Sequence, residues 1–385
     1  MTSENLPNLL IATDNFLPRR DGITRFLSTV LPHLSKNFNI TIICPDYGAE
    51  SITMENITFV KIPMTNNLIG DFKPSTFQWR KIKKTIPKAD IIFTQTIGPI
   101  GAIALYLGYK KNKKVIAFTH SIEWQLISQS IQSFILKKLL SPITKWFTKF
   151  LYNRCSYLIV PSERIADFLS WENISTGKKV IHLGVDTKKF IPYYENEKRN
   201  LIRETYGILE NEIVIGYHGR ISHEKDLKTL VRAYIVLRKK IPNAKLLIVG
   251  SGIQSIVESL MKQTGVIYVP EVSNVENFVS AMDIYCLPSL TETTSLSTLE
   301  AMSCSLPVVS TGAGFIKDYI LNGKNGYLFT KKDSFDLAKK LEKLCKNKDL
   351  RIEFGKTSRQ IAEKQFQWEA TEKKLTEFLI SQVPK

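Results

Sequence analysis

The sequence predicts an α/β fold made of two doubly wound domains, each built on a parallel sheet. Three observations lead to this prediction. Short apolar runs rich in isoleucine and valine alternate with helical stretches from end to end, as in parallel βαβ units. The series stops near the middle of the chain and then starts again. The length of 385 residues is too great for one compact core and suits two domains of ordinary size.

The first half of the chain is predicted to hold five buried strands. The first of them, at 8–14, leads through the loop 15–22 into a helix at 23–36. The other four are short apolar runs, each followed by a helical or loop stretch, at 39–45, 89–95, 114–120 and 156–162. Strands of a parallel sheet are covered on both faces and have such continuous apolar sequences. They predict a first doubly wound domain over residues 1–190.

One long apolar stretch lies within this domain. Residues 91–109 are nineteen uncharged residues, a length that would admit a membrane span. Polar and turn-forming residues interrupt the run at 94–96 and at 98–99. We therefore predict a buried strand, a glycine-containing turn and a buried helix here. A transmembrane helix is the alternative.

The strand series restarts after a polar stretch at 182–200, which has no clear period and is predicted to be a linker. A strand within 212–220 and a helix at 226–240 open the second series. Four further strands are expected within 244–252, 265–270, 283–289 and 306–311. We predict a second domain over residues 191–365. The C-terminal segment 366–385 is expected to form a helix that packs back on the first domain.

Cysteine usage and the opening residues indicate the compartment. The five cysteines are odd in number, form no C-x-x-C pair and mostly lie in apolar runs. This pattern is typical of reduced thiols in a cytosolic protein and argues against a disulfide framework or a zinc site. The first residues, MTSENLPN, are polar and unlike a signal peptide. We expect a cytoplasmic protein.

Positive charge is concentrated in the first half of the chain. The net charge of the whole chain is +17. Residues 1–190 carry 25 Lys and Arg against 13 Asp and Glu, whereas residues 191–385 carry 28 against 23. The first half therefore faces something anionic, for which nucleic acid and a phospholipid surface are the two candidates.

Ligands of doubly wound sheets bind beyond the carboxyl ends of the strands, so the residues that follow each strand are candidate site residues. Gly219 allows a tight turn after the first strand of the second domain. Arg220 and Lys225 then follow on a loop that opens a helix. A helix N-terminus with two cations combines N–H donors, dipole and charge, which favours a diphosphate. The alternative is a solvated basic loop.

Two glutamates, Glu292 and Glu300, lie eight positions apart after the strand at 283–289. The uncharged segment between them begins with TTS, which offers cap hydroxyls and backbone N–H groups at a helix start. Glu300 follows about two helical turns later, so we expect both carboxylates on roughly the same face. Carboxylates there can accept hydrogen bonds from a ribose or another sugar. The alternative is that Glu292 favours the helix dipole and that Glu300 pairs with a lysine.

Other strand ends supply further candidates. Gly252, in the stretch VGSG, leaves room for a ligand without completing a dinucleotide fingerprint. The nucleotide base is expected near 268–273, which includes Val272. In the first domain, Gly22 opens a helix, so its backbone can approach a phosphate or a sugar. His120 ends a strand at the predicted cleft, and a purely structural role is the alternative for it.

Together these residues resemble the family 4 retaining glycosyltransferases of the GT-B fold, over nearly the whole chain. The pair Gly219–Arg220 with a lysine five residues after the arginine is similar to the family's diphosphate clamp, and the two glutamates have its Glu-x7-Glu spacing. FTH, which ends at His120, and GVD with a later phenylalanine also match. Three positions depart from the family pattern. The first loop has one glycine instead of two, and Ser295 and Ser305 stand where glycine is usual.

The resemblance implies two Rossmann-like domains that face each other across a cleft, with a nucleotide sugar donor bound in it. It implies that Glu292 contacts the donor sugar, that Glu300 holds the ribose and that His120 lies beside the donor sugar. It also implies that backbone amides contact the sugar and the phosphate near Thr294, Ser295 and Leu296.

The mechanism that we expect follows from this placement. Arg220 and Lys225 stabilise the charge that builds on the departing diphosphate, which removes the need for a metal. No DxD-type motif follows a predicted strand. No carboxylate of the first domain is placed as a covalent nucleophile, so we expect front-face attack with retention of anomeric configuration. The expected catalytic residues are His120, Glu292, Arg220 and Lys225, with no cofactor beyond the nucleotide sugar as co-substrate.

Residues 126–154 suggest what receives the sugar. They include five Lys and Arg, no acidic residue, and apolar and aromatic side chains at roughly helical spacing. This composition is typical of helices that lie in an anionic bilayer interface, and the basic runs 80–84 and 110–114 add charge. We hypothesise an enzyme attached peripherally to the cytoplasmic face of the cell membrane. Its acceptor is a diacylglycerol- or phosphoinositol-type lipid or a polyprenyl-linked carrier. The structural alternative is a core-facing helix with a solvated basic side.

Other functions are compatible with some of these sequence features. A transferase with a soluble acceptor keeps the same donor site, and an epimerase or hydrolase can share the GT-B fold. A basic nucleic-acid-binding protein would interleave its cations with stacking aromatic residues on an exposed sheet or a recognition helix. Here the aromatic residues gather in one amphipathic stretch, so we expect no nucleic-acid partner.

Overall fold

The computed structural model describes residues 6–19, 21–48, 56–66, 72–130 and 133–384. The chain divides into two compact units. The N-terminal unit comprises Met1–Ser128, Ser133–His182 and Ala370–Lys385, and the C-terminal unit comprises Gln129–Gln132 and Leu183–Glu369. The chain thus returns to the N-terminal unit for its last residues. There the ring of Phe378 meets the ring of Tyr157 edge-on, with 5.5 Å between the ring centroids.

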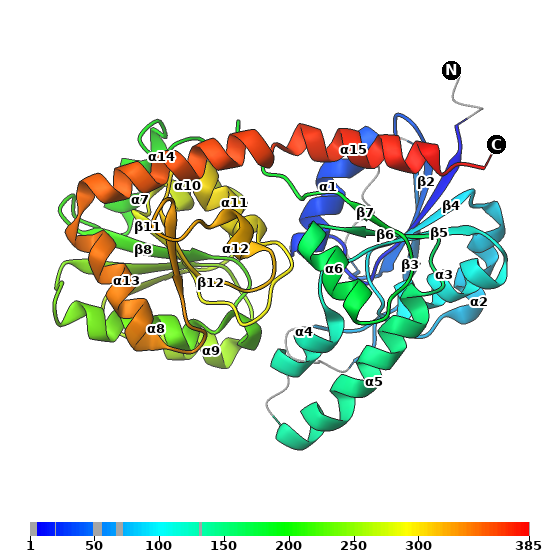
Figure 1. Cartoon of the computed structure of the whole chain (residues 1–385), viewed down its shortest axis with the longest axis horizontal. Coiled ribbons are helices and arrows are strands. Elements are labelled where there is room, and N and C mark those ends of the chain that lie inside the picture. Colours follow the sequence, from blue (N-terminus) through cyan, green and yellow to red (C-terminus); the bar gives the residue numbers. More distant parts are fainter. Residues whose placement is uncertain (1–5, 20, 49–55, 67–71, 131–132, 385) are drawn as a thin grey trace. The chain divides into compact units, whose positions relative to one another are not determined.

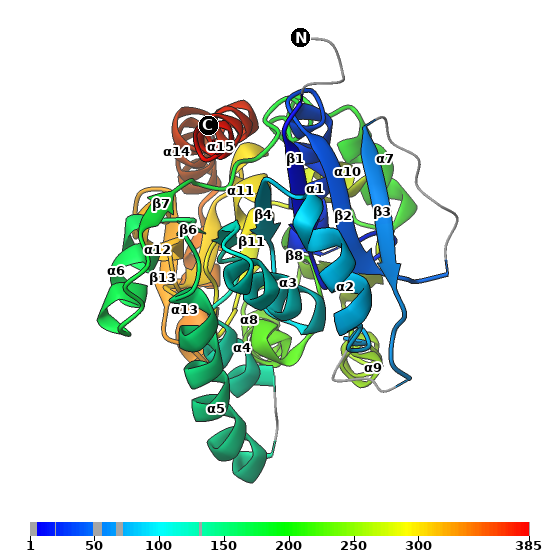
Figure 2. The same cartoon turned by 90° about the vertical axis from the view of Figure 1, so that its right-hand side faces the viewer.

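The N-terminal unit is built on a seven-stranded parallel sheet with the order β3-β2-β1-β4-β5-β6-β7 (Figures 1 and 2). The order reverses at β1, so the sheet is doubly wound. Its strands are β1 (Asn8–Ala12), β2 (Asn39–Pro45), β3 (Ile57–Ile62), β4 (Ile91–Thr94), β5 (Lys114–Phe118), β6 (Tyr157–Val160) and β7 (Lys178–Val180). Its helices are α1 (Gly22–Leu34), α2 (Trp79–Thr85), the 3-10 turn η2 (Ile86–Lys88), α3 (Pro99–Lys110), α4 (Glu123–Ser130), α5 (Phe134–Tyr152) and α6 (Glu163–Trp171).

The five strands predicted for this half are confirmed, whereas β3 and β7 were not predicted. Both are edge strands of the sheet. In β3 only Ile62 is buried, and β7 is three residues long with two lysines. The apolar residues of β3 are interrupted by Thr58 and Lys61, and β7 has a single apolar residue, so neither has the continuous apolar run used to identify the others. The stretch 91–109 forms β4, a turn and most of α3, as expected. No helix of the described residues is long and apolar enough to cross a membrane.

Helix α5 is unusual among the helices of this unit. It extends away from the sheet (Figures 1 and 2). Its buried side chains, Thr148, Leu151 and Tyr152, all lie near its C-terminal end. The alternative of a core-facing helix therefore holds only for that end.

The C-terminal unit has a six-stranded parallel sheet with the order β10-β9-β8-β11-β12-β13. Its strands β8, β11 and β12 are labelled in Figure 1. Its strands are β8 (Ile213–His218), β9 (Ala244–Val249), β10 (Val266–Val269), β11 (Ile284–Leu287), β12 (Val308–Thr311) and β13 (Gly326–Phe329). The five predicted strands are confirmed. The edge strand β13 was missed, since its two central residues are only partly buried.

Helices cover both faces of this sheet, with α8 against α13 and α11 against α14. The helices are α7 (Lys198–Thr205), the 3-10 turn η3 (His223–Lys225), α8 (Leu227–Arg238), α9 (Gln254–Met261), α10 (Val275–Ser280), α11 (Leu296–Ser303), α12 (Ile316–Tyr319), α13 (Ser334–Lys346) and α14 (Lys348–Gln365). The last helix, α15 (Trp368–Ser381), belongs to the N-terminal unit from Ala370 onward. The predicted linker 182–200 is only partly a free connection. Its Val185 and Phe190 are buried in the core of the C-terminal unit.

Candidate active site

The loops after β8 and β9 approach each other so closely that only glycine fits. Gly219 has a φ of +133°, and its amide donates to Val249 O at 2.9 Å. A Cβ on Gly250 would lie 2.0 Å from Gly219 O, and a Cβ on Gly252 would lie 1.9 Å from Ile221 O. Gly219 is predicted to allow a tight turn, and Gly252 is predicted to leave room for a ligand. In the structure Gly219 has a positive φ that favours glycine, and Gly252 is required by close backbone packing against the loop after β8.

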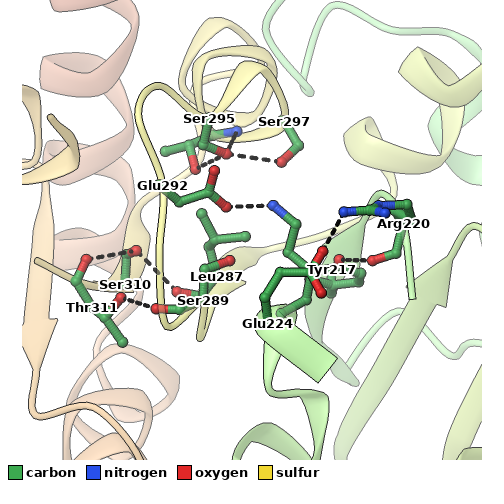
Figure 3. A network of polar contacts seen from close by, with 12 residues as sticks. Tyr217, Arg220, Glu224, Leu287, Ser289, Glu292, Ser295, Ser297, Ser310 and Thr311 are labelled. Carbon is green, nitrogen blue, oxygen red and sulfur yellow. Dashed lines mark hydrogen bonds and ion pairs between the residues drawn. The ribbon is translucent and has the colours of Figure 1, made fainter. Parts of the chain in front are cut away.

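Arg220 is held in place by its neighbours. Its guanidinium Nη2 pairs with Glu224 Oε1, and its carbonyl accepts a hydrogen bond from Tyr217 Oη at 2.6 Å (Figure 3). The Glu224 side chain is almost fully buried, whereas that of Arg220 is about one-third exposed. The carboxylate therefore anchors a guanidinium that still reaches the surface of the unit.

Lys225 and Glu292 come together although 67 positions separate them in sequence. Lys225 Nζ donates to Glu292 Oε1, and both side chains are largely buried. The loops that carry them follow β8 and β11, which are neighbours in the sheet. A backbone bond from Leu290 N to Glu224 O, 2.8 Å long, ties the two loops together. Two residues that were predicted separately thus form one ion pair.

Glu292 and Glu300 do not lie two turns apart on one helix, and the prediction of that spacing is wrong. Helix α11 begins at Leu296 with Ser295 as its N-cap, whose Oγ accepts from Thr298 N at 3.2 Å. Glu292 lies four residues before the helix, so the interval to Glu300 is not two helical turns. The carboxylates are instead placed by different contacts, Glu292 by Lys225 and Glu300 by a histidine.

That histidine is His218, the last residue of β8. Its Nε2 lies 2.7 Å from Glu300 Oε2, and both side chains are buried. The ring of Tyr285 lies beside the imidazole, with 5.2 Å between the ring centroids. Sequence reasoning missed His218. The signal that could have found it is its position at a strand end, directly before Gly219 and Arg220.

A second layer of hydrogen bonds supports the loop that carries Glu292. Ser310 Oγ donates to Leu287 O at 2.9 Å, and Thr311 Oγ1 donates to Ser289 O at 2.5 Å (Figure 3). Gly314, with a φ of +56°, passes so close that a Cβ there would lie 1.8 Å from Glu292 O. Gly314, in the segment after β12, therefore packs directly against the backbone of Glu292. Gly314 was not singled out in the sequence.

The remaining donor-side candidates have less defined surroundings. Thr294 Oγ1 is buried and has no hydrogen-bond partner among the described residues. The amide of Ser295 donates to Tyr319 Oη at 3.4 Å, and Leu296 is the first residue of α11. Val272 follows β10 and packs against the core of the C-terminal unit.

Gly22 and His120 belong to the N-terminal unit. Gly22 is the first residue of α1, and the N-cap Asp21 accepts a hydrogen bond from Thr24 N at 2.9 Å. His120 follows β5, and its Nε2 lies 2.9 Å from Gln95 Oε1. Burial lowers the pKa of His120 to about 3, so the imidazole is neutral at physiological pH. It can therefore exchange hydrogen bonds with a ligand but cannot contribute a positive charge.

Two family profiles match the chain. The one described as "Glycosyl transferases group 1" covers residues 198–361, and the one described as "Glycosyltransferase Family 4" covers residues 20–189. The group 1 segment contains Arg220, Lys225 and both glutamates.

Similar proteins extend over the whole chain. The capsular polysaccharide biosynthesis glycosyltransferase CapM of Staphylococcus aureus is 25% identical over 96% of each chain. The alpha-monoglucosyldiacylglycerol synthase of Streptococcus pneumoniae is 23% identical over 82% of this chain and 74% of its own. Among solved structures, Anabaena Alr3699/HepE in complex with UDP-glucose superposes with a TM-score of 0.78 at 18% identity, covering 97% of this chain and 99% of that one. At this low identity, the superposition shows a shared fold and nothing more.

Proposed function

Since the chain belongs to the family 4 (group 1) glycosyltransferases and has their GT-B fold, we propose that it is a retaining hexosyltransferase. It moves a hexose from a UDP- or GDP-sugar to a membrane lipid or a lipid-linked acceptor. The observation that carries the proposal is the ion pair between Lys225 and Glu292. It joins a cation suited to a diphosphate and a carboxylate suited to sugar hydroxyls at two neighbouring strand ends.

The proposed chemistry is electrostatic. The bond between the anomeric carbon and the diphosphate oxygen breaks, and negative charge builds on the departing diphosphate. Arg220 and Lys225 stabilise that charge from anchored positions, so no reorganisation is needed at the moment of reaction and a metal is not required. Glu292 orients the sugar and Glu300 the ribose. The acceptor hydroxyl attacks from the face that the diphosphate leaves, and its proton passes to the diphosphate.

The proposed lipid acceptor is supported by the surface of α5. Phe134 and Trp146 are 77% and 65% exposed, and further large apolar side chains are exposed at Ile135, Leu136, Leu139 and Ile143. Lysines are interspersed among them, and residues 126–154 include no acidic residue. Ile131 and Gln132 of this stretch lie outside the described residues. An exposed apolar and cationic helix suits an anionic bilayer interface. One similar protein is named for a glucosyldiacylglycerol product.

The test is an activity assay with a panel of UDP- and GDP-sugars, with and without a total lipid extract. Release of nucleotide diphosphate that requires lipid is expected from one donor. In Glu292→Ala it should fall by at least about 100-fold, since the variant loses the sugar contact and leaves Lys225 without its partner. Glu353→Ala, which changes an exposed glutamate on α14, is the matched control and should keep full activity. Release that needs no lipid would instead indicate a soluble acceptor, an epimerase or a hydrolase.

A further inference from the structure

The N-terminal unit has a pocket of about 570 Å³ at the carboxyl ends of β1, β2 and β3. Arg19 comes from the loop between β1 and α1, Tyr47 from just after β2, and Met64 from just after β3. Lys73 also lines the pocket. In a doubly wound sheet this edge is where ligands bind.

We propose that this pocket binds the phosphate of the acceptor's head group, so that the acceptor is a phosphate-bearing lipid and not an uncharged diacylglycerol. The inference rests on the proposed function, since it names the class of acceptor for that reaction. It adds a binding site in the N-terminal unit that is made of residues outside the donor site.

The backbone fixes Lys73 beside the end of β3. Met64 pairs with Ser75 in an antiparallel bridge. Thr65 N donates to Pro74 O at 2.8 Å, and Thr76 N donates to Pro63 O at the same distance. These main-chain bonds therefore tie the segment directly after Lys73 to the segment after β3.

Of the charged residues that line the pocket, Lys73 is the one we expect to bind an anionic ligand. Arg19 Nε lies 3.3 Å from Asp21 Oδ2, and Asp46 Oδ1 lies 4.0 Å from Lys61 Nζ. Each of these two lining residues is thus close to an opposite charge. Within the described part of the chain, no carboxylate lies at ion-pair distance from Lys73. An anionic ligand is therefore favoured at this point of the pocket.

A second lining residue points to the same chemistry. The hydroxyl of Tyr47 is buried and has no hydrogen-bond partner among the described residues. A buried hydroxyl without a partner is costly, and a phosphate oxygen is an acceptor that relieves the cost. The Lys73 ammonium can pair with a phosphate, whereas a diacylglycerol offers no charge to pair with it.

The test separates the lipids by charge. A lipid extract of the source cells is split on an anion-exchange column into an uncharged and an anionic fraction, and nucleotide diphosphate release is measured with each. We expect release with the anionic fraction. Release with the uncharged fraction alone overturns this inference and leaves the proposed function standing. Release with neither fraction overturns both. Release with sn-glycerol 3-phosphate in place of lipid shows a soluble phosphate acceptor and overturns the lipid assignment.

Variants then test the pocket itself. Lys73→Met should raise the half-saturating concentration of anionic lipid by about 10-fold to 100-fold, as expected for losing a charged hydrogen bond. The KM for the donor should not change. Tyr47→Phe should give a smaller increase. Lys36→Met, which removes an exposed charge at the end of α1, is the control for net charge. Equal lipid saturation in Lys73→Met and Lys36→Met would place the head group elsewhere.

Discussion

The cations of the candidate active site are each anchored by a carboxylate. Arg220 pairs with Glu224 and Lys225 pairs with Glu292. A long cationic side chain loses rotamer entropy when it is fixed, and an anchor in the folded protein means that this cost does not fall on ligand binding. Glu292 therefore has two roles in the proposed reaction: it contacts the sugar, and it holds the lysine that faces the diphosphate.

Glu123 is a buried carboxyl in the N-terminal unit whose charge should control pH stability. Its Oε1 accepts a hydrogen bond from Tyr152 Oη at 2.8 Å, and burial raises its pKa from 4.5 to about 7. The protonated form thus stabilises the fold. This contribution is complete below pH 4.5 and is lost as the pH rises through about 7.

Glu123→Gln mimics the protonated carboxyl. We expect it to match the wild type near pH 4 and to exceed its free energy of unfolding by on the order of 2 kcal/mol near pH 8. Thermal or urea unfolding across that range checks this. His120→Asn is the control, because the contribution of His120 to stability depends on pH in the opposite direction. The lowered pKa of His120 contributes stability above 6.5 that is lost as the pH falls toward 3. A difference between Glu123→Gln and wild type that is independent of pH would refute the assignment.

At the scale of one element, the end of α11 shows why a departure from the family pattern matters. Ser305 follows the helix with a φ of +60°, in the left-handed region where glycine is favoured. Its hydroxyl is also buried without a hydrogen-bond partner among the described residues. The serine therefore carries a steric cost and a desolvation cost at the same position.

Ser305→Gly should raise the free energy of unfolding by about 1 kcal/mol, because it removes both costs. Urea denaturation measures the change as a higher midpoint at constant m-value. Ser303→Gly is the matched comparison, because Ser303 lies within α11 and its Oγ donates to Phe190 O at 2.6 Å. That variant should be destabilised. Destabilisation of Ser305→Gly as well would mean that the serine makes a contact that outweighs the strain.

At the scale of the whole molecule, the net charge of +17 and the exposed side of α5 should act together on a membrane. Charge attracts the protein to anionic lipid at low salt, and apolar side chains keep it there when salt screens the charge. The two contributions can therefore be separated by ionic strength.

We expect the protein to float with vesicles that contain phosphatidylglycerol, and less so as salt rises. The double variant Phe134→Ser/Trp146→Ser should lower the bound fraction several-fold at moderate salt, since about 25 cal/mol is lost per Å² of apolar surface that no longer inserts. Trp171→Ser is the control, since Trp171 is 82% exposed on α6. If both sets of variants float equally well, α5 is not the membrane contact.

The sequence by itself determined the fold class, the strands with long apolar runs in both sheets and the family, because burial on both faces of a parallel sheet leaves a continuous apolar run. It also identified Arg220, Lys225, Glu292 and Glu300 as candidate site residues, from their positions after strand ends and from the family resemblance. Only the tertiary structure revealed the edge strands β3, β7 and β13, which are short or only partly buried. It also decided which charges meet: Lys225 with Glu292, and Glu300 with the unforeseen His218. Each pair joins residues that are distant in sequence, and the neighbouring places of β8 and β11 in the sheet bring their segments together.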